Sequence, residues 1–172
     1  MTTVTVATEI AAPVEQVFQV FTDLEHSAAR ISNIRKIELL TVGGLRPGAR
    51  WLETREVFGR EDTAEMAITR YERNRAYTIT HYKAGARIDA VFTFTPNDDR
   101  TTVRVEFDLQ GDGLPPGLLA PVRWAIADKV RAVIGHDLAD LKHFIEGRYP
   151  SAARIDRAPV APLTEDDDTE GG

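Results

Sequence analysis

The 172-residue sequence contains no cysteine. This absence excludes disulfides, thiolate nucleophiles, iron–sulfur clusters and every zinc motif built on cysteine. No apolar run approaches the roughly 18–20 residues that a membrane-spanning helix needs, which argues against stable membrane insertion. The first ten residues, MTTVTVATEI, have neither the basic start nor the apolar block of a secretory signal, so we expect a cytoplasmic protein.

A strong charge bias is also missing from most of the chain. The formal net charge is −6, but residues 151–172 alone carry six acidic residues against two arginines, so the remainder is nearly neutral. There is no basic stripe of the kind that binds nucleic acid. Because the last residues mix proline, small residues and acids, we expect one domain over residues 1–149 and a disordered tail over residues 150–172.

Metal-binding and nucleotide-binding motifs are absent as well. Two of the four histidines, His136 and His143, share the last predicted helix but stand seven residues apart, about 10 Å along the axis and too far for one ion. The sequence has no GxGxxG, P-loop, GxSxG or HExxH, and no serine or threonine is visibly coupled to a base. We therefore expect neither a metal ion nor a cofactor.

What the sequence does contain is a long alternation of apolar and polar residues. Val4, Val6 and Ile10 predict an opening strand, and two short helices over residues 13–25 and 26–31 follow a proline turn. Short turn clusters separate the later segments, which predicts antiparallel hairpins with one face in water. The six further strand candidates cover residues 34–42, 50–57, 62–72, 76–83, 87–95 and 101–109.

A long amphipathic helix is predicted to end the regular structure, through Trp124 to Gly147. Counted from the end of GDGLPPG at Gly117, its roughly 30 residues would span about 45 Å, enough to cross the whole sheet. Gly135 in its middle predicts a kink or the close approach of another segment. A strongly curved sheet that grips a single helix leaves space between the two layers. Its apolar face comprises Ile126, Val130, Val133, Ile134, Leu138, Leu141, Phe144 and Ile145.

The order of these elements resembles the helix-grip fold of the START-like (SRPBCC) superfamily, especially its polyketide cyclase/dehydrase-type branch. The similar stretches, over residues 3 to about 147, are EIAAPVEQVFQVFTDLE, ISNIRKIELL, the glycine turn before ARWLE, ITRYERNRAYTIT and DLADLKHFIEG. The resemblance implies an α+β domain in which a curved seven-stranded antiparallel sheet wraps around the C-terminal helix, with two short helices between the first two strands. The superfamily has no universal catalytic motif, so the resemblance implies no active-site residues.

Inward-facing aromatic and flexible apolar side chains can line a cavity for a flat, apolar ligand, although a plain packed core is an equal alternative. Polar groups such as Arg55, His81 and Asp137 would orient that ligand. The candidate ligand-binding residues are Trp51, Arg55, Met66, Tyr77, His81, Phe92, Phe94, Ile126, Val130 and Asp137.

His81 and Asp137 are also the two candidates for acid–base catalysis. An imidazole titrates near neutrality and could protonate a ligand carbonyl, but a surface or hydrogen-bonded strand histidine is the simpler interpretation of His81. Asp137 falls in the apolar stripe, where a carboxylate must be paired or have a raised pKa. Arg55 and Arg70 are both possible partners, and a structural ion pair is favoured over catalysis.

These observations favour the binding of a small hydrophobic or aromatic metabolite, lipid-like or polyketide-like, between the sheet and the C-terminal helix. One alternative is a cyclase or aromatase type of enzyme that uses an acid–base residue of the pocket. Another is a protein-interaction module that uses the exposed sheet face or the acidic tail. Exposed sheet edges are compatible with a homodimer.

Overall fold

The computed structural model describes residues 2–57, 59–83, 86–111 and 120–148, and of residues 2, 3, 57, 111 and 120–126 the backbone alone. The predicted order of a strand, two short helices, six strands and a long helix is confirmed. The strands are β1 (Thr2–Ile10), β2 (Ile34–Leu39), β3 (Arg50–Val57), β4 (Arg60–Glu72), β5 (Ala76–Lys83), β6 (Ala86–Asn97) and β7 (Arg100–Gly111). The helices are α1 (Val14–Thr22), the 3-10 turn η1 (Leu24–His26), α2 (Ser27–Arg30) and α3 (Ala120–Arg148).

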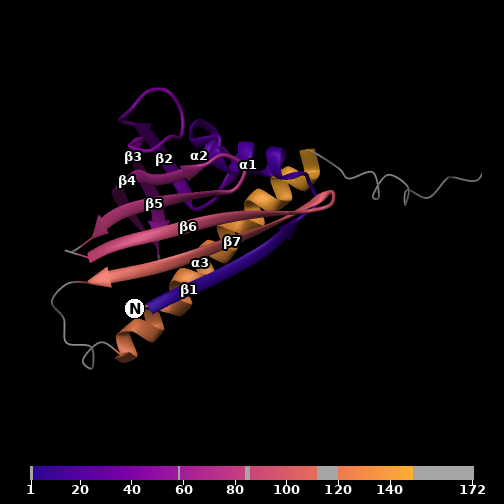
Figure 1. Ribbon diagram of the computed structural model, residues 1–172. Coiled ribbons are helices and arrows are strands. Elements are labelled where there is room, and N and C mark those ends of the chain that lie inside the picture. Colours follow the sequence, from indigo (N-terminus) through magenta and orange to yellow (C-terminus); the bar gives the residue numbers. More distant parts are fainter. Residues whose placement is uncertain (1, 58, 84–85, 112–119, 149–172) are drawn as a thin grey trace, which may run out of the picture.

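The seven strands form one antiparallel sheet in the order β1-β7-β6-β5-β4-β3-β2. The chain therefore starts at one edge, crosses through α1, η1 and α2 to the other edge, and returns strand by strand to β1. The sheet is curved, and α3 crosses it diagonally in the manner of a helix-grip fold (Figure 1). Such curvature places the two layers in close contact at one end of the helix and farther apart along the rest.

A closed core lies where α1 meets the last turns of α3. Phe18 of α1 is 3% exposed and makes edge-to-face contacts with Tyr71, Tyr77 and Phe94, with ring centroids 5.6, 6.1 and 5.0 Å away. Ile145 of α3 is fully buried in the same cluster. The backbone N–H of Ala11, just after β1, donates to Glu146 Oε1 at 2.9 Å. Packing and this bond together fix the C-terminal end of α3 against the sheet.

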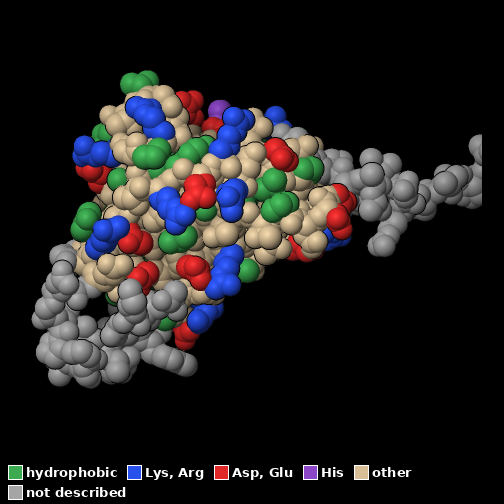
Figure 2. Space-filling view, in the orientation of Figure 1, with side chains coloured by type: hydrophobic (Ala, Val, Ile, Leu, Met, Phe, Trp, Pro, Cys, Tyr) green, Lys and Arg blue, Asp and Glu red, His purple; other side chains and the backbone are tan. Residues whose placement is uncertain are grey.

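The opposite face of the sheet is lined by charged pairs. Arg87 pairs with Asp89 along β6, and Arg104 pairs with Glu106 along β7. Because side chains alternate along a strand, these residues point away from the face that α3 covers. Acidic and basic side chains are mixed on the face of the molecule shown in Figure 2. This distribution agrees with the predicted sheet, which has one face in water.

The sequence prediction for β2 was too long at its C-terminal end. The strand ends at Leu39 rather than at residue 42, and the backbone N–H groups of Leu40 and Thr41 both donate to the carbonyl of Arg50. Gly43 and Gly44 follow with φ of +102° and +72°. These angles lie outside the extended region, so the backbone turns at the glycines. The strand therefore cannot continue through the residues just before them, although apolar residues are among these.

Two further expectations concern α3 and the end of the chain. A Cβ placed on Gly135 would meet no atom within 4 Å, so the expected close approach of another segment was wrong, and α3 continues through this position. Residues 150–172, predicted as a disordered tail and a possible docking segment, lie outside the described residues. Within the described part of the chain, no helix has the length and apolar character needed to span a membrane.

Candidate functional site

A cavity of about 370 Å³ separates the sheet from the middle of α3. Its volume falls within the ~300–1,000 Å³ typical of small-molecule sites. Most of its wall is apolar. The sheet contributes, among others, Trp51, Ala64, Met66, Ile79, Ala90, Phe92 and Phe107. The apolar residues that α3 contributes are Val130, Val133, Ile134, Leu138 and Leu141.

The hollow exists because small side chains face α3 where the aromatic cluster ends. Ala64 of β4 and Ala90 of β6 both line the cavity. Further along β6, Phe94 is 3% exposed and packs against Phe18 and Phe21 of α1. The cavity therefore begins beside Phe21, the residue of α1 that lines it.

Three side chains with ionisable groups, Glu53, Arg55 and Asp137, form a cluster in the cavity wall. The Arg55 guanidinium donates through Nη1 to Asp137 Oδ2 at 2.6 Å and through Nε to Glu53 Oε1. Trp51 Nε1 donates to the second oxygen of Glu53 at 3.1 Å. The side chains of Glu53, Asp137 and Arg55 are only 8%, 14% and 22% exposed. The cluster thus joins β3 to α3 and places two carboxyl groups around one guanidinium.

Burial and charge act in opposite directions on this cluster. Burial alone would lower the pKa of Arg55, but the negative charges of Glu53 and Asp137 outweigh it and raise the pKa of the guanidinium. Burial raises the pKa of Asp137, and the nearby Arg55 guanidinium and Asn33 side chain offset this only in part. Asp137 Oδ1 is buried and accepts no hydrogen bond from the residues that the structure describes. Arg55 therefore compensates the carboxyl group of Asp137 only in part.

The partner of Asp137 is Arg55, one of the two arginines that the sequence left open. Arg70 is instead exposed on β4 and pairs with Glu72. The pairing register between β4 and β5 shifts between Ile68 and Arg70. Such a bulge reverses which face the following side chains occupy, which explains why Arg70 points away from α3.

His81 lies on the cavity side of β5, directly opposite Met66 of β4. Burial lowers the pKa of its imidazole, and the negative charge of Glu53 opposes this only in part. The ring is therefore neutral at neutral pH. Its nitrogens make no hydrogen bond to any residue in the described part of the chain, so both are available to a molecule in the cavity.

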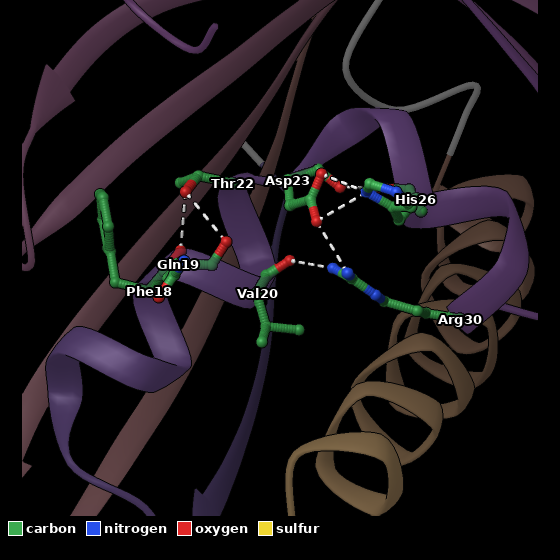
Figure 3. A network of polar contacts seen from close by, with 8 residues as sticks. Phe18, Gln19, Val20, Thr22, Asp23, His26 and Arg30 are labelled. Atoms are coloured by element: carbon green, nitrogen blue, oxygen red, sulfur yellow. Dashed lines mark hydrogen bonds and ion pairs between the residues drawn. The ribbon is translucent and has the colours of Figure 1, made fainter. Parts of the chain in front are cut away.

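The segment from η1 to α2 covers one side of the cavity through Leu24, Ser27 and Ile31. A polar network fixes this segment to α1 (Figure 3). Arg30 Nη2 donates to Asp23 Oδ2 at 2.7 Å, while Nη1 donates to the Val20 carbonyl at 3.4 Å. Burial alone would raise the pKa of Asp23, but hydrogen bonds from His26 and Arg30 outweigh it and lower the pKa.

The same segment is also fixed to α3. The Arg30 guanidinium lies over the Phe144 ring, 4.7 Å from its centroid. After α2, the backbone N–H and the hydroxyl of Ser32 both donate to Asp140 Oδ2 at 2.8 Å. The Ser32 oxygen is also 2.8 Å from His136 Nε2. These contacts make η1 and α2 a well-anchored part of the cavity wall.

The structure places eight of the ten candidate ligand-binding residues around the cavity, and their contact with a ligand stays a prediction. Phe94 does not line it, because α1 covers that end of β6. The side chain of Ile126 lies outside the described residues. Sequence reasoning missed Glu53, although its alternation with Trp51 and Arg55 on β3 was a usable signal.

The fold and the cavity define a helix-grip protein with an internal cavity between its sheet and its C-terminal helix. Comparable solved structures include the Zhui aromatase/cyclase from Streptomyces sp. R1128, which is 18% identical with a TM-score of 0.72 over 88% of this chain and 97% of that one. A START superfamily protein from Mycobacterium smegmatis is 18% identical with a TM-score of 0.69, over 86% of this chain and 99% of the other. At these identities the likeness shows the fold alone.

Comparison of the sequence with profiles of known families identifies the family of this chain. The profile of the family described as "Polyketide cyclase / dehydrase and lipid transport" matches residues 1–146, and the chain belongs to this family. No sequence among the curated proteins matches the chain. Membership and fold together support a ligand-binding or a cyclase role.

Proposed function

We propose that the protein binds a small hydrophobic or aromatic metabolite in the cavity between the sheet and α3. The observation that carries the proposal is the apolar wall of a 370 Å³ space that the core side chains leave unfilled. Burial of an apolar ligand there would contribute about 25 cal/mol per Å² of surface removed from water. The family description, which includes lipid transport, supports the same role.

Two polar groups would orient the ligand within this apolar space. The Arg55 guanidinium is held by Glu53 and Asp137, and its Nη2 donates to no residue in the described part of the chain. The neutral imidazole of His81 supplies one donor and one acceptor on a neighbouring part of the wall. A few fixed polar groups in an apolar pocket are the usual means of setting ligand orientation.

Blocking the cavity tests the proposal. The neutral, polarity-sensitive dye Nile red should fluoresce strongly with the wild-type protein, and Ala90→Trp should weaken its binding by about tenfold or more because the indole fills the space between β6 and α3. The matched control is Val91→Trp, which adds the same ring on the opposite face of the same strand.

Equal binding by Ala90→Trp and the wild type would place the dye elsewhere on the molecule. A wild-type protein that takes up no dye, and that releases no small molecule in native mass spectrometry, would contradict the proposal itself.

A cyclase or aromatase type of enzyme is the second candidate, and the neutral, unpaired His81 in the cavity wall favours it. For a binding protein, we expect His81→Ala and Asp137→Asn to change affinity only a few-fold and no product to form from a poly-β-ketone substrate mimic. Mass spectrometry of the protein incubated with this substrate mimic decides between a binding protein and an enzyme. Product formed by the wild type and lost in a variant that still binds would establish the enzyme.

A further inference from the structure

We infer that the cavity selects an uncharged ligand and rejects a carboxylate of the same shape. This inference rests on the proposed function and specifies the ligand class, namely neutral ketones, amides, phenols or alcohols rather than free fatty or aromatic acids. It follows from how the charges in the cavity wall are distributed between buried and exposed positions.

The buried charges do not balance. Glu53 and Asp137 supply two negative charges to the one positive charge of Arg55, and all three side chains are less than a quarter exposed. In a water-excluding wall such a charge is weakly screened, so it acts strongly on a nearby ligand charge. A carboxylate entering the cavity would lose its hydration and also meet this negative field.

The remaining charges on the wall are at its exposed rim. Lys83 and Asp62 pair with each other, and their side chains are 55% and 43% exposed. Lys129 of α3, which also lines the cavity, is exposed. Water and salt screen such groups over about 10 Å at ordinary ionic strength. They add little to the field inside the cavity, where the Glu53–Arg55–Asp137 cluster dominates.

Arg55 does not convert the site into an anion anchor, because two carboxylates already hold it. The carboxylate of an acidic ligand would be the third negative charge around a single guanidinium. A carbonyl or hydroxyl oxygen can instead accept from Nη2 with no change in the net charge. The neutral His81 ring accommodates the same uncharged groups.

A matched pair of probes tests the inference. 2-Naphthamide and 2-naphthoate have nearly the same shape, but only the second is charged at neutral pH. In competition with Nile red, we expect the wild type to bind the amide at least about tenfold more tightly than the carboxylate. Asp137→Asn removes the excess buried charge while it keeps an acceptor for Arg55, so the preference should fall to about threefold or less.

The matched control is Glu106→Gln, which removes an exposed carboxylate on the water-facing side of the sheet and should leave the preference unchanged. Equal or tighter binding of 2-naphthoate by the wild type overturns the inference, and this result does not depend on whether any variant folds. Loss of the preference in Glu106→Gln also overturns it, as does the failure of both probes to displace bound Nile red. A wild type that binds no dye and neither probe overturns the proposed function as well.

Discussion

Arg55→Met is expected to lower the free energy of unfolding by about 3–5 kcal/mol. The methionine fills a similar volume but leaves Glu53 and Asp137 as two buried carboxylates without a cation. Removing one partner of a buried ion cluster is far more costly than the cluster's net contribution to stability, because the desolvated charges remain. Urea denaturation of the wild type and the variant, followed by circular dichroism, measures the difference.

The control for this prediction is Arg104→Met, whose partner Glu106 lies on the water-facing side of the sheet. Both of those side chains are well exposed, so the loss should be about 0–1 kcal/mol. Adding Glu53→Gln and Asp137→Asn to Arg55→Met should restore most of the lost stability, because no buried charge is then left. A loss below about 1 kcal/mol for Arg55→Met would mean that water already reaches the two carboxylates.

Phe18→Ala is expected to lower the free energy of unfolding by about 3–5 kcal/mol, the cost of a large cavity in a packed core. Phe18 is 3% exposed and touches three aromatic rings, those of Tyr71, Tyr77 and Phe94. These rings lie on three different strands and cannot close over the space that the truncation leaves. The same urea titration measures the effect.

The matched control is Phe92→Ala, in the same β6 strand as Phe94. Phe92 stacks on Tyr77 with a centroid distance of 4.7 Å, but its other side faces the cavity. Its ring has fewer packing partners to lose, so we expect a loss of about 1–2 kcal/mol. An equal loss of unfolding free energy in Phe18→Ala and Phe92→Ala would indicate that side chains fill the region beneath α3. That result would contradict the cavity described above.

The secondary structure followed from the sequence because its periodicity is strong and local. Alternation in segments such as 101–109 and helical spacing in 13–25 need no information from distant residues. The main error, the overlong β2, arose because apolar residues after Leu39 continue the pattern while the glycines beyond them leave the extended region.

The candidate site was predicted less completely, because its residues are brought together from separate elements. Asp137 had two possible arginine partners at the sequence level, and the register shift in β4 decided for Arg55. Phe94 shares a strand face with Phe92, but Phe94 is enclosed by Phe18 and Phe21 of α1, whereas Phe92 also borders the cavity. Glu53 acquires its role through contacts with Trp51 and Arg55 at a buried position, which composition alone does not reveal.

By itself, the sequence determined the number and order of the strands and the apolar face of the final helix, because these depend on the spacing of neighbouring residues. The tertiary structure alone decided that space remains under α3 and that two carboxylates share one arginine beside it. Both features depend on how far apart the curved sheet holds the helix, and that separation is set by side chains distant in the sequence.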